Sequence, residues 1–274
     1  MAAVNEGVAV LLRASLRDRG VWWVLGGWTA FTLENVLLSE NRSLIRRSWG
    51  GSGGQGAYQG FYSILSAATL SSTIFAYWRF ARFGVQLPGP RPLSIRATAI
   101  ALRAAGLVGI GQLIPPINIA AAPIALGIHA PPPELAPMER GAMGCPFDFN
   151  AYKERGEVYG ITRVSRRPEL CGLGAVSLAG ALLATTATQV AFFGVGPVLC
   201  FIALAAHADR TMQLAGDVSP IKVEQTSVTP FLALLDGRQS WAKLWEETDP
   251  ANATAGVTLA LLMALRPPWM RLVK

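Results

Sequence analysis

Histidine, cysteine and charged residues are all scarce in this sequence. Of its 274 residues, two are histidine, three are cysteine and 15% are charged, whereas 51% are hydrophobic and the mean hydropathy is +0.36. Two histidines are too few for a metal site built from several imidazoles, and the cysteines form no CxxC pair, so no disulfide framework is predicted. The apolar excess excludes disorder and exceeds what a single water-soluble core covers.

Several catalytic and binding motifs are also missing. The sequence has no GxGxxG, GxxxxGK[ST], HExxH or GxSxG element in a suitable context, which argues against nucleotide-binding, zinc-protease and hydrolase functions. The net charge of +7 would favour nucleic acid as a partner of a soluble protein. Here the arginines gather between apolar runs, as in 44–47 and 163–167, where lipid headgroups would meet them. We therefore expect a lipid bilayer as partner and no nucleic acid.

The apolar runs predict the fold. A helix needs about 20 apolar residues to cross the hydrocarbon of a bilayer. Six runs approach or reach this length, and a seventh, 117–128, is about half as long and is expected to be re-entrant. The six are 21–38, 58–80, 95–114, 170–187, 189–207 and 251–265. The sequence therefore predicts an all-α, polytopic integral membrane helix bundle with about six transmembrane helices, folded as a single domain over 1–274.

Three stretches are expected outside the hydrocarbon. Residues 1–20 mix basic and acidic side chains with apolar ones and predict an amphipathic surface helix, without the features of a secretory signal or a transit peptide. Residues 129–168 are rich in proline, glycine and charge, and residues 209–250 are mostly polar, so both predict extramembrane connections. Basic residues occur in nearly every connection and give no firm orientation.

A few polar residues fall within or beside the apolar runs. Glu34 and Arg103 are a candidate ion pair with a structural role. The alternatives are that each side chain extends on its own to the membrane–water interface, or that the two line a ligand pocket. His129 lies in a proline-rich loop. His207 lies at the end of the fifth run, where a histidine commonly contacts terminal carbonyls. The alternative for His207 is a single-histidine haem site inside an apolar pocket.

Two groups of motifs resemble a known membrane family. The segment SRRPE at 165–169 and the segment AHADR at 206–210 are similar to the TRHP-type and HGDRR-type ends of a helical hairpin in the NnrU domain family. The segments TSVTPF at 226–231 and LLDGRQ at 234–239 resemble the TSVxPFxAxxDGRQ stretch of its plant and algal branch, the 15-cis-zeta-carotene isomerases. The resemblance extends over about 165–239.

This resemblance implies a protein of a plastid membrane, either envelope or thylakoid, that holds haem b and isomerises the central cis double bond of a poly-cis carotenoid to trans. His207 would be the iron ligand, with Arg166 or Arg210 beside the cofactor. Asp236 and Arg238 would be the candidate catalytic residues, although they could equally pair with each other and fix a turn.

The sequence departs from the family at three histidine positions, one of which corresponds to about Gly180. Arg167 stands where the TRHP motif has histidine, and a guanidinium offers no lone pair to iron. The family's early histidine-containing segment corresponds roughly to 39–47, which contains no histidine. The alternative function is therefore a catalytically silent subunit that binds carotenoid or chlorophyll and docks with a photosystem or antenna complex. The nitrogen-oxide-related role of bacterial members is a third and weaker alternative.

Overall fold

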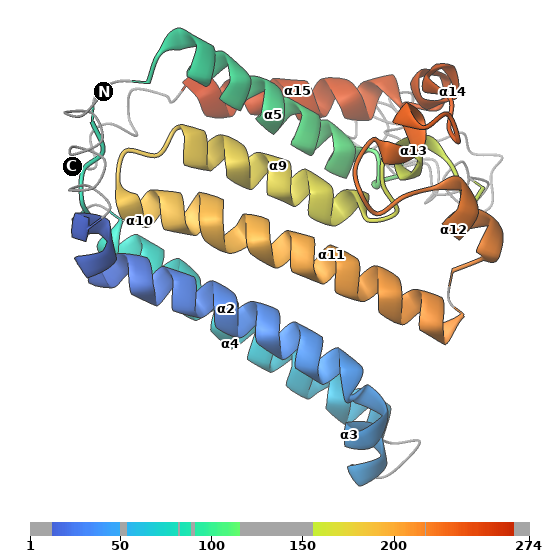
Figure 1. Ribbon diagram of the computed structural model, residues 1–274, viewed down its shortest axis with the longest axis horizontal. Coiled ribbons are helices and arrows are strands. Elements are labelled where there is room, and N and C mark those ends of the chain that lie inside the picture. The colour runs from blue at the N-terminus through green and yellow to red at the C-terminus, as the bar shows by residue number, and fades with distance from the viewer. Residues whose placement is uncertain are drawn as a thin grey trace, which may run out of the picture. The chain divides into compact units, whose positions relative to one another are not determined.

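The computed structural model describes residues 13–49, 54–81, 83–88, 91–115, 156–216 and 218–265. Within these residues all the secondary-structure elements are helices (Figure 1). The strand-like pairing among them is limited to an isolated antiparallel bridge between Gln86 and Thr186. The all-α fold class is thereby confirmed. Residues 1–12 of the expected amphipathic segment, the run 117–128, His129 and most of the connection 129–168 lie outside the described residues.

The chain forms two compact units, each made from two segments that are distant in sequence. Unit 1 comprises Met1–Gly106 and Leu170–Val218, and unit 2 comprises Leu107–Glu169 and Ser219–Lys274. Two of the three boundaries between the units fall inside helices, and the third lies just before Ser219.

Unit 1 is built from long helices. Its helix α2 packs lengthwise against α4 and against α11 (Figure 1). Helix α11 continues directly from α10 through the π-helical turn η3. The elements are α2 (Arg19–Glu40), α3 (Arg42–Ser48), α4 (Gly54–Phe80), most of α5 (Leu93–Gly111), most of α9 (Pro168–Leu182), α10 (Ala187–Val190), η3 (Ala191–Val195) and α11 (Gly196–Ala215).

Trp28 lies at the centre of the unit 1 core. Its ring is 8% exposed and meets Phe31 and Phe201 edge-on, with ring centroids 6.0 Å apart in both pairs. Its indole Nε1 donates to the carbonyl of Phe192, 3.2 Å away, so the buried N–H is satisfied. A Cβ on Gly196 would lie 2.2 Å from Trp28 Cδ1, which explains why glycine stands there.

The ends of the unit 1 helices carry recognisable caps. Asp18 precedes α2, and its carboxylate accepts from Gly20 N at 2.8 Å. The same carboxylate also accepts from Val85 N at 3.1 Å and from Thr188 Oγ1 at 3.2 Å, which ties three segments together. Helix α11 ends at Gly216, whose φ of 74° is the left-handed conformation that favours glycine.

Unit 2 is built from shorter helices around the end of α5. Asn252 Nδ2 donates to the carbonyls of Gly111 at 3.1 Å and Ile114 at 3.2 Å, which caps α5. A Cβ on Gly256 would lie 2.8 Å from the backbone nitrogen of Val108, so the two helices touch backbone to backbone there. The elements are η2 (Gly160–Arg163), α12 (Pro220–Gln225), α13 (Leu232–Leu235), α14 (Trp241–Glu246) and α15 (Pro250–Leu265).

The six-span bundle is not confirmed. Two described helices are long and apolar enough to cross a membrane, namely Leu93–Gly111 and Ala187–Ala215. Helices α9 and α15 are apolar but have only 15 and 16 residues. Helices α2 and α4 have the length, 22 and 27 residues, but polar residues are spread along both. The fourth and fifth apolar runs form helices that are joined by a turn at 183–186, where Thr186 caps the second helix.

The close approach of α2 to α4 depends on Gly27. A Cβ on Gly27 would lie 2.2 Å from Thr73 Oγ1 and 3.3 Å from Thr73 Cα, so rotating the threonine side chain would not remove the clash. We expect Gly27→Ala to destabilise the protein by about 1–3 kcal/mol through overpacking. Denaturation in detergent, followed by circular dichroism, measures the loss.

The neighbouring glycine provides the control. A Cβ on Gly26 would meet no atom within 4 Å, and alanine is the better helix former. Gly26→Ala should leave the stability unchanged or raise it by less than about 1 kcal/mol. Equal effects of the two substitutions would show that helix contact at Gly27 does not control stability.

Candidate functional site

His207 lies inside a helix and not at the end of one. The fifth apolar run was expected to end at His207, but α11 continues to Ala215. Contact with terminal helix carbonyls is therefore the wrong account of this histidine. Its side chain is 13% exposed, and its ring faces the last turn of α2 within unit 1.

The two ring nitrogens of His207 face different groups. Nε2 lies 2.5 Å from the hydroxyl oxygen of Ser39, and Nδ1 lies 3.8 Å from a carboxylate oxygen of Glu40. Ser39 Oγ also lies 2.7 Å from the carbonyl of Asn35 and 3.0 Å from that of Val36. A hydroxyl has one proton, so Ser39 accepts from Nε2–H in one tautomer of His207 and donates to Nε2 in the other. We call His207, Ser39 and Glu40 the His207 cluster.

More polar groups lie one turn earlier on α2. The Tyr62 hydroxyl of α4 donates to Asn35 Oδ1, and Asn35 Nδ2 donates to the carbonyl of Phe31 at 2.7 Å. Glu34 is 8% exposed, and its Oε1 lies 3.4 Å from the Asn35 amide. The polar side chains of α2 therefore continue inward from the His207 cluster, toward the middle of unit 1.

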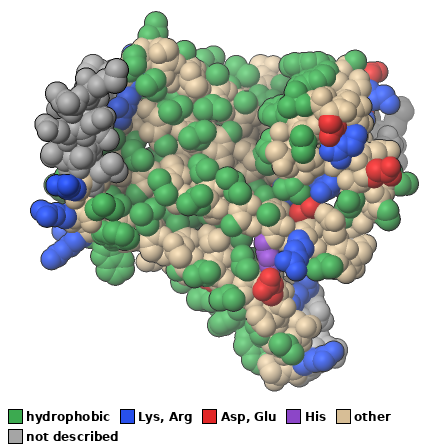
Figure 2. All heavy atoms as spheres, in the orientation of Figure 1, with side chains coloured by type: hydrophobic (Ala, Val, Ile, Leu, Met, Phe, Trp, Pro, Cys, Tyr) green, Lys and Arg blue, Asp and Glu red, His purple; other side chains and the backbone are tan. Residues whose placement is uncertain are grey.

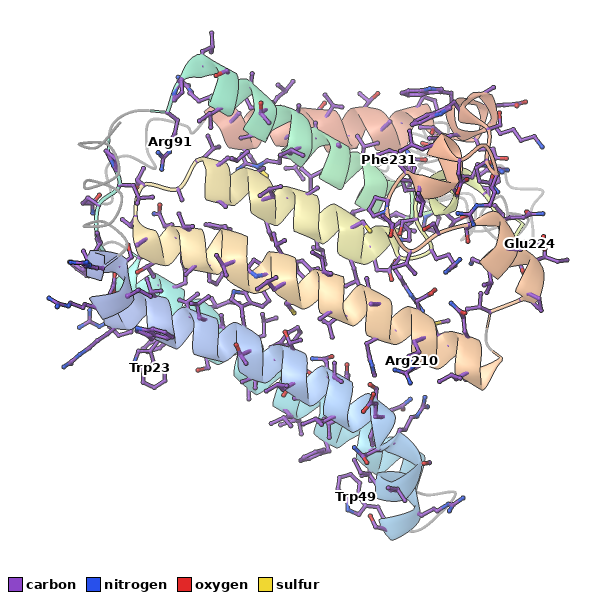
Figure 3. The ribbon with its side chains drawn as sticks, in the orientation of Figure 1. Trp23, Trp49, Arg91, Arg210, Glu224 and Phe231 are labelled. Carbon is purple, nitrogen blue, oxygen red and sulfur yellow. The ribbon has the colours of Figure 1, made fainter. Side chains whose placement is uncertain are left out.

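Glu34 and Arg103 are both buried, each with 8% exposure. The expected ion pair between Glu34 and Arg103 does not form among the described residues, because Glu34 Oε1 contacts Asn35 and the buried Oε2 has no hydrogen-bond partner. Arg210 lies on α11 three residues after His207 and is exposed, projecting from the helix in Figure 3. Because side chains three residues apart share a helix face, Arg210 is the predicted cofactor-binding arginine that lies on the His207 side of α11.

Haem iron does not fit the His207 cluster as it is arranged. An axial histidine must offer a nitrogen lone pair at about 2.0–2.1 Å from a metal. Here the Ser39 hydroxyl occupies that direction from Nε2 at 2.5 Å. Among the described residues, no group of three or more His, Cys, Asp and Glu side chains is placed to hold a metal ion.

Arg166, the other predicted cofactor-binding arginine, belongs to unit 2. Its guanidinium Nη1 donates to the carbonyls of Val223 at 2.9 Å and Thr226 at 2.7 Å. Its backbone N donates to the carbonyl of Ser227 at 2.8 Å. Arg166 thus holds the chain where α12 ends and the TSVTPF segment begins. Arg167, which replaces the family histidine, has its Nη1 3.8 Å from Glu169 Oε1.

Asp236 and Arg238, the candidate catalytic residues, pair with each other. Arg238 Nε and Nη2 donate to the same Asp236 oxygen, Oδ2, at 2.9 and 2.7 Å, and Gly237 between them has a φ of 82°. Arg238 Nη1 also donates to the carbonyls of Glu224 at 2.9 Å and Thr226 at 3.0 Å. The hydrogen bonds from Arg238 lower the pKa of the exposed Asp236 carboxyl. The arrangement is that of a fixed turn, the structural alternative for this motif.

Arg163 forms the buried centre of unit 2. Its Nε and Nη2 donate to the two oxygens of Glu247 at 2.7 and 2.5 Å, and its Nη1 donates to Gln239 of the DGRQ motif. Gly160 N adds a further bond to Glu247 Oε2 at 2.6 Å. A two-pronged arginine–carboxylate pair of this kind fixes geometry as well as charge. We call Arg163, Gln239 and Glu247 the Arg163 clasp.

The environment of Glu247 changes its titration. Burial raises the pKa of its carboxyl, but the hydrogen bonds from Arg163 and Gly160 outweigh burial, and the net pKa is lowered. A lowered folded-state pKa means that the pair contributes its full stability above the ordinary glutamate pKa. That contribution is lost as the pH falls through the lowered value.

Sequence analysis missed Ser39, Glu40, Glu247 and the partners of the motif arginines. One signal pointed to Ser39, because the segment 39–47 was matched to the family's early histidine-containing segment. The structure places the first residue of that segment against His207. No signal in the sequence pointed to the pairing of Arg163 with Glu247, which lie 84 residues apart.

We expect Glu247→Gln to destabilise the protein by about 2–3 kcal/mol at neutral pH, because Arg163 would stay buried without its charge partner. The difference from the wild type should begin to shrink below the ordinary glutamate pKa of about 4.5 and should be lost as the pH falls through the lowered pKa of folded Glu247. Denaturant titrations at several pH values measure both effects. Glu246→Gln is the matched control, since Glu246 is the exposed neighbour. A pH-independent difference would contradict the assigned role of the Arg163 clasp.

A family model described as NnrU protein matches residues 27–273, which is nearly the whole chain and includes residues of both units. No curated protein and no solved structure matches the chain. The family match contains the His207 cluster, the Arg163 clasp and the TSVTPF and DGRQ segments, and on its extent the chain belongs to the NnrU protein family.

Proposed function

We propose that this chain is an integral membrane protein of the NnrU family that works without haem, as a structural, pigment-binding subunit of a photosynthetic membrane complex. One observation carries the proposal. The residue that meets Nε2 of His207 is Ser39, at the position where the resemblance to the family implies a histidine-containing segment. The site therefore has a hydroxyl where a second imidazole would be needed.

The motif residues of unit 2 support the same conclusion. Arg166 and Arg238 both donate to the carbonyl of Thr226, at 2.7 and 3.0 Å, and Gln239 Nε2 donates to the carbonyl of Gln225 at 3.0 Å. Each of these side chains satisfies backbone groups that α12 leaves unpaired at its end. They are engaged in holding the fold and not in presenting free groups to a substrate.

The surface supports a membrane location. Many large hydrophobic side chains are exposed, and green hydrophobic atoms cover much of the face in Figure 2. On α11, Leu199 and Ile202 are 62% and 63% exposed, within a helix long and apolar enough to cross a bilayer. A soluble monomer rarely exposes apolar surface on this scale. The partners that fit are lipid tails, carotenoid or chlorophyll, and the apolar helices of a photosystem or antenna complex in a plastid membrane.

A second candidate function is 15-cis-zeta-carotene isomerisation with haem b. The observation in its favour is Glu40, whose carboxylate lies 3.8 Å from Nδ1 of His207. Histidines that bind metals commonly have their other ring nitrogen beside a carboxylate. The tautomer with its proton on Nδ1 would carry the lone pair on Nε2, and Ser39 would have to turn away for iron to reach that lone pair. The two functions therefore differ in whether Ser39 or iron meets Nε2 of His207.

Haem titration of the purified protein separates the two functions. We expect no Soret band that depends on His207, because the Nε2 position is occupied by Ser39. The absorption spectra of the wild type and of His207→Ala, each mixed with haem and passed through a desalting column, should coincide. A wild-type band that His207→Ala removes, together with conversion of poly-cis zeta-carotene beyond a haem-only control, would establish the isomerase.

Extraction in mild detergent tests the subunit role. We expect the chain to migrate with a pigmented complex on a native gel and to retain carotenoid or chlorophyll. Pigment extracted from the excised band and separated by chromatography identifies the ligand. Complete recovery of the chain as a free, colourless protein would overturn the proposal.

A further inference from the structure

An open groove runs along α2 in unit 1. It has a volume of about 510 Å³ and is lined by Arg19, Trp22, Trp23, Gly26 and Gly27, with Ser72 contributed by α4. The lining positions on α2 recur at intervals of three and one residues, which is one face of a helix. The groove therefore follows the helix axis and does not cross it.

The groove has two aromatic walls and a floor of glycine. Trp22 and Trp23 are 56% and 61% exposed, and Figure 3 shows Trp23 projecting away from α2. The Trp22 indole is held in place, since its Nε1 donates to the carbonyl of Leu16 at 2.7 Å. The space beside Gly26 is empty, because no atom lies within 4 Å of the position a Cβ would take there. At Gly27 that space is filled by Thr73.

A cation stands at one end of the groove. Arg19 is exposed, in the first turn of α2, and within the described part of the chain its side chain makes no hydrogen bond or ion pair. Arg13 and Arg17, just before it, are exposed as well. The neighbouring carboxylate of Asp18 already accepts from three donors of unit 1. The start of a helix adds a further partial positive charge.

The groove thus combines a narrow apolar track with a positive end. From Arg19 to Ala30, its last lining residue on α2, the helix rises about 16 Å. An amphiphile with a long hydrocarbon chain and an anionic headgroup is complementary to this groove, because its chain fits the apolar part and its headgroup fits the positive end. A hydrocarbon carotenoid would leave Arg19 without a partner. Tryptophan and arginine are also the side chains that gather at the boundary between lipid tails and headgroups.

We propose that this groove binds one anionic membrane lipid, with an acyl chain lying over Gly26 and Gly27 between the tryptophans and the headgroup meeting Arg19. The inference rests on the membrane location of the proposed function and not on its pigment or its partner complex. Lipid bound here would line the outer face of the contact between α2 and α4.

Native mass spectrometry in mild detergent tests the proposal, with phosphatidylglycerol and phosphatidylcholine of identical acyl chains as probes. The wild type should retain phosphatidylglycerol in preference. Arg19→Gln should weaken binding of phosphatidylglycerol about five-fold and leave phosphatidylcholine unchanged, because one arginine at a membrane surface contributes about that factor. Arg47→Gln, an exposed arginine on α3, is the matched control and should change neither.

Gly26→Leu tests the apolar track. The open space over Gly26 accepts the new side chain without a clash, so the protein should fold, and both lipids should bind at least about five-fold more weakly because the groove is filled. Gly60→Leu on α4 is its control, since Gly60 also has nothing within 4 Å of a Cβ position. Circular dichroism verifies that every variant is folded.

Two results would overturn the inference. One is equal retention of the two lipids by the wild type, and the other is undiminished lipid binding by Gly26→Leu. Pigment is measured on the same samples. Loss of pigment with retained lipid preference would count against the proposed function alone, and loss of lipid preference with retained pigment would count against the groove alone.

Discussion

Buried polar groups must find partners within the chain, because neither an apolar core nor lipid provides any. Burying a polar group without a hydrogen bond costs several kcal/mol, and burying an unpaired charge costs more. In unit 1 this constraint accounts for the hydrogen bond of the Trp28 indole and for the three bonds to Asp18. In unit 2 it accounts for the Arg163 clasp.

The same constraint explains why the family motifs act mainly on the fold. Helix α12 has six residues, so most of its carbonyls lack partners within the helix. Arg166 precedes the TSVTPF segment in the sequence and Arg238 follows it, and both donate to the carbonyl of Thr226. Phe231 at the end of that segment adopts a φ of 64°, and its N–H donates to the carbonyl of Val164. Motif residues that match a family can therefore indicate that the chain shares the family's fold without indicating that it shares the family's reaction.

The helices and the candidate site were predictable to different degrees. The apolar runs predicted α2, α4, α5 and α15 to within a few residues, because a continuous apolar stretch can be recognised from neighbouring residues alone. The fifth apolar run predicts an end at His207, but α11 continues through polar residues to its cap at Gly216, because an apolar run does not display the end of a helix that carries polar residues.

Pairings between distant residues carried no comparable signal. Ser39 and His207 are separated by 168 residues, and their contact depends on how α2 packs against α11. The resemblance to the family indicated the segment that begins at Ser39, but not the hydroxyl contact. The resemblance also led to Arg166, Asp236 and Arg238 as site residues, and their roles in the turn follow from carbonyls that no sequence motif displays.

The π-helical turn at Ala191–Val195 has a consequence for the His207 cluster. A π turn holds one more residue than an α turn, and each residue of an α-helix advances the direction of the side chains by about 100°. The directions of the α11 side chains therefore depend on the number of residues in the π turn, which lies more than ten residues before His207. Loss of a single residue from that turn would swing the imidazole off the α2 side, and the residues flanking it are alanines, Ala206 and Ala208. In this chain the His207 cluster thus depends on the helical register upstream as well as on the side chains that form it.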